Sequence, residues 1–332
     1  MLQLPWKTRG ICLAAPKPDE LDLFDQFVKE KLVPGGCNLI VLLVRYRYRF
    51  KSHPECVNPR DPLDEASAKH VADTCRSYGI RLVPKMNLMG HQSEKAADTY
   101  DGLLRGYPEF DETPHLSEVF YCRSLCPKHP SIKPVIYDLM DEMTDVFSAD
   151  GLHIGMDEVF DIGKCPRCKD TPTYRLFAEW VTDLYRHNLR RGIQTLMWGD
   201  RLLNGLETDY GSWEASGNFT EPAIELLPKD ILICDWHYED MTEYLSVDIF
   251  ANAGFRILLC PWRYQANAEK FIDYAKNHDR GHIEGVMATT WINSGDLMRY
   301  NLNGERGGST SPATLEALSY TIDWIFGSGE NR

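Results

Sequence analysis

Short apolar runs recur along the entire chain, and each of them ends in polar or aromatic residues. They lie at 11–16, 38–46, 80–87, 151–158, 195–200, 231–238, 255–262 and 285–293. Continuous apolar runs of this length are typical of strands buried on both faces, which are found in parallel sheets. Most neighbouring runs begin about thirty to forty residues apart. The pattern therefore predicts a repeated strand–helix unit.

The segments between the runs carry helix signals. In 19–33, apolar residues recur at helical spacing and acidic residues gather in the first turn, where the helix dipole favours them. The segment 64–79 closes with Gly79, a typical residue just beyond a helix. Eight strands alternating with helices predict a (β/α)₈ TIM barrel, formed as a single domain over residues 1–332. An open, doubly wound sheet is the alternative, but no Gly-rich phosphate-binding motif follows any of the runs.

One interval, at about 88–150, is much longer than the others. A stretch of this length is too long for a plain turn, so we expect an insertion that folds over one mouth of the barrel as a lid or wall. No low-complexity linker, internal repeat or change in composition marks a second domain.

The charge balance narrows the classes of partner. Lys and Arg number 36 and Asp and Glu 49, which gives a formal net charge of -13. A field of this sign repels phosphate backbones and anionic lipids, so we expect neither a nucleic acid nor a membrane as partner. No apolar run approaches the roughly 20 residues that a bilayer requires, and the first thirty residues lack the pattern of a secretory leader. These features predict a cytoplasmic protein and leave oligomerisation open.

The chain contains ten cysteines, too few for a disulfide scaffold. Several, such as Cys12, lie in apolar runs, where a thiol behaves as a small hydrophobic side chain. Reduced core cysteines are therefore the first expectation. Two close pairs allow a second interpretation, a four-thiolate zinc site. Its ligands would be Cys122, Cys126, Cys165 and Cys168.

Polar and aromatic side chains gather at the ends of the predicted strands. In a barrel the carboxyl ends of all strands meet at one face, where active sites are built. Tryptophans are prominent there, and indole rings beside polar groups suit a sugar, whose C–H faces stack on aromatic rings. The strand ends supply Lys17, Arg45, Tyr46, Asn87, His91, Asp157, Glu158, Trp198, Asp200, Trp236, Tyr238, Trp262, Tyr264, Trp291 and Asn293.

Two adjacent acids, Asp157 and Glu158, close the fourth run. Neighbouring residues within a strand point to opposite faces, but where the chain leaves the sheet both carboxylates can turn toward the mouth of the barrel. Two acids in one partly desolvated cavity tend to separate into a protonated acid and an anion, the pair needed to cleave a glycosidic bond. The alternative is a pair of ordinary surface acids that follow a strand.

Several motifs in order resemble a known family. The segment HIGMDEV at 153–159 matches a His-x-Gly-x-Asp-Glu signature, and KMNLMGH at 85–91 and TRGICLAAPK at 8–17 are similar to the segments at the family's third and first strands. The likeness continues through Trp198, Trp236 and the segments PWRY and TTWIN. The chain resembles glycoside hydrolase family 20, the β-N-acetylhexosaminidases, and especially the short hexosaminidase D-like members.

The resemblance implies a catalytic barrel that hydrolyses terminal N-acetylglucosamine or N-acetylgalactosamine. The acetamido group of the substrate would attack its own anomeric carbon, with retention of configuration and without a metal or organic cofactor. Glu158 would be the general acid and base, and Asp157 would orient the acetamido N–H. A tyrosine would hold the acetamido oxygen, with Tyr264 as first choice and Tyr238 as second.

The remaining strand-end residues would shape the sugar site. Trp198, Trp236 and Trp291 would enclose the acetamido methyl group and the ring, and exclude water. His91 would hydrogen-bond near the acids. Further substrate contacts are expected from Lys17, Arg45, Asp200, Tyr238, Trp262 and Asn293.

Three departures from the family pattern concern contacts to the outer hydroxyls of the sugar. Many members carry Asp and Arg at the end of the first strand, where this chain has 14–17, AAPK. An acid commonly follows the last tryptophan by two residues, at the position of Asn293, and two acids commonly precede the Gly-His pair, where Lys85 and Asn87 stand. The preference for gluco or galacto sugars therefore does not carry over from the family.

Other interpretations remain open from the sequence. A non-catalytic glycan-binding barrel would explain the departures, and a metal-dependent hydrolase could use His91, His153 and Asp157, although no paired metal-ligand spacing supports it. The segment 45–50, RYRYRF, alternates basic and aromatic residues. It forms either a solvated edge or a basic rim that attracts an anionic aglycone.

Overall fold

The computed structural model describes residues 4–94 and 99–327, and its centre is a closed barrel of eight parallel strands in sequence order. Closure between the first and last strands confirms the predicted TIM barrel and excludes the open sheet. The strands are β1 Thr8–Ala14, β2 Leu39–Leu43, β3 Arg81–Lys85, β4 Gly151–His153, β5 Gln194–Trp198, β6 Leu232–Asp235, β7 Arg256–Leu259 and β8 Ile283–Thr289.

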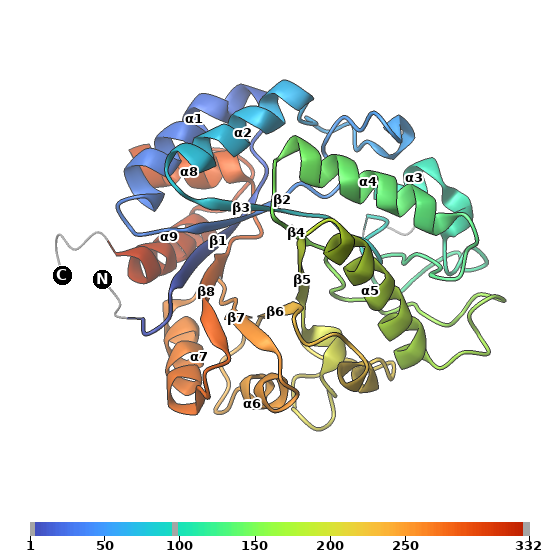
Figure 1. Ribbon diagram of the computed structural model, residues 1–332. Helices are drawn as coiled ribbons and strands as arrows, with labels where there is room; N and C mark the ends of the chain where they lie inside the picture. The colour runs from blue at the N-terminus through green and yellow to red at the C-terminus, as the bar shows by residue number, and fades with distance from the viewer. Residues whose placement is uncertain (1–3, 95–98, 328–332) are drawn as a thin grey trace.

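Helices surround the barrel, as Figure 1 shows. The α-helices are α1 Leu21–Phe27, α2 Glu65–Ser77, α3 Gly102–Gly106, α4 Ile132–Val146, α5 Thr173–Arg190, α6 Leu245–Asn252, α7 Gln265–His278, α8 Ser294–Asn303 and α9 Pro312–Phe326. Within the described ranges, none of the helices combines the length and the apolar character needed to cross a bilayer.

The strict alternation of strand and helix is broken once. The connection from β5 to β6, all of it described, contains the 3₁₀ turns Asp200–Leu202 and Glu221–Glu225 and no α-helix. The prediction of a helix between every pair of strands was therefore wrong at this position. Turns and loops there leave room for side chains that reach over the mouth of the barrel.

Both faces of the strands are buried, as the continuous apolar runs predict. In β2, Leu39, Val41 and Leu43 point into the bore, whereas Ile40 and Leu42 pack against the helices. The ten cysteines are buried, and none of them forms a disulfide. Cys12, Cys234 and Cys260 fill the bore, in agreement with their expected role as small core residues.

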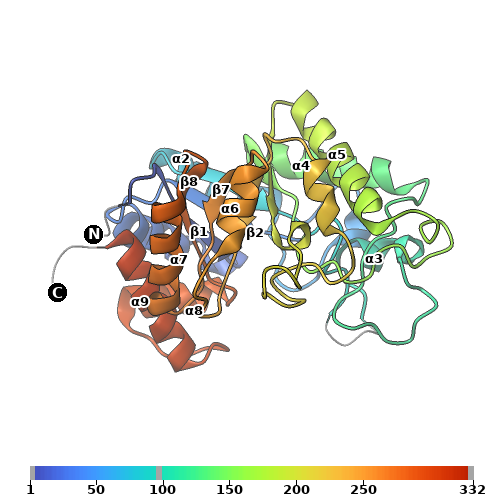
Figure 2. The same ribbon diagram turned by 90° about the horizontal axis from the view of Figure 1, so that it is seen from below.

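The insertion expected at about 88–150 is shorter than the sequence suggests, because α4 packs in the ring of barrel helices. The inserted part precedes α4 and carries α3; its residues 95–98 lie outside the described residues. Figure 2 shows the segment around α3 on the side of α4 and α5, away from α7 and α9. Several of its side chains form one wall of the cavity described below.

Candidate active site

A cavity of about 850 Å³ opens at the carboxyl ends of the strands. Its size is in the range usual for small-molecule sites. Residues at the carboxyl ends of seven strands, β2 to β8, line it, together with the inserted segment and the β5–β6 connection. From the strand ends it receives Arg45, Tyr46, Lys85, Asn87, His91, Asp157, Glu158, Trp198, Trp236, Tyr238, Trp262 and Trp291.

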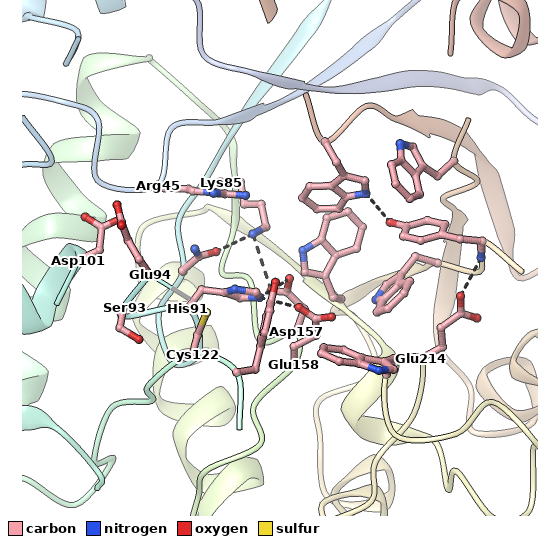
Figure 3. Close-up of a pocket in the computed structure, with 18 of the residues that line it drawn as sticks. Arg45, Lys85, His91, Ser93, Glu94, Asp101, Cys122, Asp157, Glu158 and Glu214 are labelled. Carbon is pink, nitrogen blue, oxygen red and sulfur yellow. Dashed lines mark hydrogen bonds and ion pairs between the residues drawn. The ribbon is translucent and has the colours of Figure 1, made fainter. Parts of the chain in front are cut away.

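Asp157 and Glu158 converge on one nitrogen atom. Nε2 of His91 lies 3.1 Å from Oδ2 of Asp157 and 3.2 Å from Oε2 of Glu158, and Figure 3 shows the three side chains pointing toward one another. Strand β4 ends at His153, and Met156 and Glu158 then adopt positive φ angles of 78° and 49°. This departure from extended backbone is what brings two adjacent side chains to the same side of the sheet.

Two glycines permit the close approach of the segments that carry these side chains. A Cβ atom on Gly90 would lie 2.8 Å from the carbonyl oxygen of Asp157, and one on Gly155, whose φ is 79°, would lie 2.8 Å from the carbonyl oxygen of Met86. Any larger residue would separate the His91 segment from the acidic pair. Close packing of the two segments therefore explains why both motifs contain a glycine at this position.

A buried lysine adds positive charge beside the acids. Nζ of Lys85 lies 2.7 Å from Oδ1 of Asn87 and 3.8 Å from Oδ1 of Asp157. Burial opposes ionisation of Asp157, but Lys85 and His91 hold the pKa of its carboxyl well below the usual range. Burial likewise opposes protonation of His91, and the charge and hydrogen bond of Asp157 raise its pKa well above the usual value. The free site thus contains an Asp157 carboxylate paired with a His91 imidazolium.

Asp200 lies beneath the cavity and supports Glu158 and one indole. Its Oδ2 accepts hydrogen bonds from the backbone N–H of Glu158 at 2.9 Å and from Nε of Arg201 at 2.7 Å. Its Oδ1 accepts one from Nε1 of Trp236 at 3.3 Å. Burial raises the pKa of Asp200 to about 6, and Arg201 opposes part of that rise.

Aromatic rings form the wall opposite the inserted segment. The rings of Trp198 and Trp291 lie 5.6 Å apart, and those of Trp236 and Tyr238 lie 4.8 Å apart. Nε1 of Trp291 donates a hydrogen bond of 2.6 Å to the hydroxyl oxygen of Tyr238. Trp262 contacts Tyr238 at 5.2 Å between ring centres. The indoles that the sequence places at strand ends therefore share one concave surface.

Three expected substrate contacts lie elsewhere. Tyr264, the first choice for the acetamido oxygen, is 49% exposed and does not line the cavity, because the chain turns outward into α7 directly after it. The side chain of Asn293 caps α8 by accepting a hydrogen bond from the N–H of Asp296. Lys17 forms an ion pair with Asp61 outside the cavity. We therefore correct the expected placement of all three, and also that of Asp200, which supports the lining without joining it.

Several lining residues were missed because they come from long connections. Tyr121 and Cys122 reach the cavity from the insertion, and Trp213 and Glu214 reach it from the β5–β6 connection. Glu214 is anchored by the N–H of Tyr238 at 2.9 Å and by Nδ1 of His237 at 2.7 Å. The only signal in the sequence was the Trp-Glu pair within a Gly- and Ser-rich stretch at 211–217.

Among the residues that the structure describes, two groups of side chains have metal-ligand character. His91, Asp157 and Glu158 form the first, whereas His153 is buried in the bore, where its ring contacts that of Trp198 at 4.5 Å between centres, and is not part of the group. The trio suggested by the sequence is therefore not assembled.

The second group differs from the expected four thiolates. Cys126, Cys165 and Cys168 come together as expected, but Cys122 lines the cavity near His91, and Glu112 takes the fourth position. The four-cysteine cluster that the sequence left open as an alternative is not formed, because the side chain of Cys122 lies on the cavity side of the inserted segment.

Comparison with known proteins agrees with this geometry. The sequence model described as glycosyl hydrolase family 20, catalytic domain, matches residues 58–296. A beta-hexosaminidase of Emericella nidulans is 22% identical over 233 residues, which cover 62% of this chain and 35% of that protein. The chain thus spans about a third of the length of this curated relative.

Solved structures share the fold. A chitobiase of Flavobacterium johnsoniae superposes with a TM-score of 0.67 at 17% identity, over 98% of this chain and 51% of the other. A β-N-acetylhexosaminidase of Bacteroides fragilis gives 0.66 at 14% identity, over 98% and 68%. Since the family match covers well over half of the sequence and includes the acidic pair, the chain belongs to glycosyl hydrolase family 20.

Proposed function

We propose that this protein is a retaining exo-β-N-acetylhexosaminidase that releases terminal N-acetylglucosamine or N-acetylgalactosamine by substrate-assisted catalysis. One observation carries the proposal: Asp157 and Glu158 converge on His91 inside a cavity with an aromatic wall. Family membership supports the same activity, as do the names of the similar proteins, a beta-hexosaminidase and a β-N-acetylhexosaminidase.

In the first step the acetamido oxygen of the substrate attacks the anomeric carbon, and the glycosidic C–O bond breaks. Glu158 donates its proton to the departing oxygen, and an oxazolinium ion forms. In the second step water attacks the same carbon, Glu158 takes a proton from that water, and the acetamido group is restored. Two inversions at one carbon give net retention.

Asp157 is suited to orient the acetamido group and to stabilise its developing positive charge. The carboxylate stays ionised because of Lys85 and His91, as the lowered pKa indicates. Its Oδ1 has no hydrogen-bond partner among the described residues, so the group has acceptor capacity beyond the bond to His91. A preorganised anion of this kind acts most strongly in a site from which water is excluded.

Tyr238 takes the place that the sequence interpretation gave first to Tyr264. Its oxygen accepts a hydrogen bond from Trp291, and its hydroxyl also bonds the side chain of Thr289, so on substrate binding the O–H proton would turn from Thr289 toward the acetamido oxygen. Burial raises the pKa of Tyr238 well above the usual value, so the hydroxyl keeps that proton. A donor of this kind can hold the acetamido oxygen against the anomeric carbon.

The decisive experiment uses the full chain and compares its rates of hydrolysis on different nitrophenyl glycosides. We expect release of nitrophenol from the N-acetyl-β-glucosaminide or the N-acetyl-β-galactosaminide and little from the plain β-glucoside, which lacks the nucleophile. The sugar first formed should be the β-anomer when followed by NMR. Equal rates on the plain glucoside would contradict acetamido participation. Binding of N-acetylglucosamine thiazoline without any turnover would favour the glycan-binding alternative.

A further inference from the structure

A second polar cluster lies outside the cavity and is independent of the proposed hydrolysis. Glu112 and Cys126 belong to the insertion, and Cys165 and Cys168 follow β4 a few residues after the acidic pair. All four residues are buried, and one ligand atom from each lies within 4.8 Å of the others. Folding therefore brings together four possible metal ligands from two distant segments.

The distances between the sulfur atoms fit ligands around one ion. Sγ of Cys126 lies 3.4 Å from Sγ of Cys165 and 3.6 Å from Sγ of Cys168. A disulfide bond would need about 2.05 Å. Two thiolates on a tetrahedral zinc ion, each about 2.3 Å from the metal, stand about 3.8 Å apart. The observed spacing is therefore close to that of a zinc site and far from that of a bond.

Glu112 provides the independent sign of a missing ligand. Its Oε1 accepts hydrogen bonds from the N–H groups of Lys164 at 2.8 Å and Cys165 at 3.2 Å. Its Oε2 is fully buried and meets no donor with normal hydrogen-bond geometry, and Glu112 forms no ion pair within the part of the chain that the structure describes. The side-chain group that interacts with its carboxylate is the Cys165 thiol, a weak donor and itself a possible metal ligand. A buried carboxylate oxygen without a donor or cation is costly.

The local backbone resembles a zinc-binding turn. Cys165 and Cys168 are separated by two residues, the usual spacing of paired zinc ligands. The N–H groups of Cys168 and Lys169 donate to the carbonyl oxygen of Cys165, so the turn holds both thiols on the same side.

We propose that Glu112, Cys126, Cys165 and Cys168 bind one structural zinc ion as three thiolates and one carboxylate oxygen, Oε2. Binding forms three Zn–S bonds and one Zn–O bond, and the thiol protons pass to solvent. Four protein ligands close the coordination shell, which is the arrangement of a structural and not of a catalytic zinc.

The position of the site indicates a structural role for the ion. It ties the insertion, which supplies Tyr121 and Cys122 to the cavity wall, to the segment that continues from Glu158. Without the ion, these two connections are held together chiefly by hydrogen bonds and packing between loops. We therefore expect zinc to stabilise this side of the cavity mouth.

The test begins with the wild-type full chain, purified without a metal-affinity resin. We expect about one zinc ion per chain by plasma mass spectrometry. After exchange with Co²⁺, thiolate-to-cobalt charge-transfer absorption and strong visible bands of tetrahedral cobalt should appear. Absence of zinc together with absence of these bands would overturn the proposal, as would a Cys126–Cys165 disulfide in protein purified under reducing conditions.

Variants then assign the ligands. The double variant Cys165→Ser, Cys168→Ser should retain less than about a tenth of the zinc, and Glu112→Gln should weaken zinc affinity by roughly 10-fold or more in competition with a chromophoric chelator. Cys37→Ser is the matched control, because a hydroxyl can still donate to the carbonyl oxygen of Leu39 as this thiol does; it should keep its zinc. Zinc content in the double variant equal to that of wild type would refute the assignment.

Discussion

The carboxylate of Asp200 accepts a hydrogen bond of 2.9 Å from the backbone N–H of Glu158. The bond is made at a residue whose φ is positive, just where the chain has left strand β4. The same carboxylate binds the indole N–H of Trp236, so one buried group positions both the proposed general acid and part of the aromatic wall. Asp200 is thus a positioning residue that does not itself line the cavity.

Replacement of Asp200 by Asn should reduce both turnover and stability. The amide cannot accept from all three donors, and the buried Arg201 loses its counter-charge. We expect kcat to fall by roughly 10- to 100-fold, because loss of the bond to the backbone of Glu158 would displace this acid from the glycosidic oxygen, and proton transfer is sensitive to small displacements. The free energy of unfolding should fall by about 3 kcal/mol in urea titrations. Asp240→Asn, which breaks an exposed ion pair with Lys270, should change stability by less than about 0.5 kcal/mol. Full kcat in Asp200→Asn would argue against a positioning role.

Substitution of the two acids should give different leaving-group profiles. Glu158→Gln removes the proton donor, so substrates with poor leaving groups should slow by about 10²-fold or more and those with acidic phenols by much less. Asp157→Asn removes charge stabilisation of the oxazolinium and should slow both kinds of substrate similarly. Steady-state rates across a series of aryl N-acetylglucosaminides measure this. If the rate loss in Glu158→Gln were the same for good and poor leaving groups, the assignment of Glu158 as the acid would be contradicted.

The two tyrosines provide a matched pair of variants. Tyr238→Phe removes the hydroxyl inside the cavity and should lower kcat/KM by roughly 10-fold or more, because the acetamido oxygen loses its donor. Tyr264→Phe removes an exposed hydroxyl outside the cavity and should leave kcat/KM within about 2-fold of wild type. The reverse result would restore the choice that the sequence favoured.

A buried histidine should make stability depend on pH. His237 bonds Glu214 through Nδ1 and lies 3.1 Å from Asp235 and 2.8 Å from Ser246 through Nε2. Burial works against its protonation, but Asp235 and Glu214 raise its pKa to about 9.

Because an unfolded histidine titrates near 6.5, the stabilisation by His237 is complete below about pH 6.5 and is lost as pH rises through about 9. The free energy of unfolding should decrease over this window by about 3 kcal/mol from this group alone. His237→Gln should flatten that part of the profile in urea titrations. A slope that is equal in the variant and in wild type would show that His237 does not carry the effect.

The barrel and the centre of the candidate site were predictable from local pattern. Each apolar run overlaps one strand, and the rule that parallel strands end at one face places Asp157, Trp198 and Trp236 together without knowledge of distances. Gly90 and Gly155 belong to motifs recognisable in the sequence, although only the structure supplies their packing reason.

The residues that the sequence interpretation misplaced or missed lie in connections whose path depends on packing against other segments. Tyr264 follows β7 closely, yet the start of α7 turns it outward, and Asn293 is used as a helix cap. Trp213 and Glu214 reach the cavity from a connection that has no α-helix to set its path. Long loops such as these obey no local periodicity.

The sequence by itself determined the eight strands, the acidic pair and the ring of indoles, because these depend on short-range pattern and on one general property of parallel barrels. Only the tertiary structure decided which tyrosine faces the cavity and that Glu112, rather than Cys122, joins the three clustered cysteines. The physical reason is that a loop's path is set by contacts between segments far apart in the chain, and those contacts leave no periodic trace in its residues.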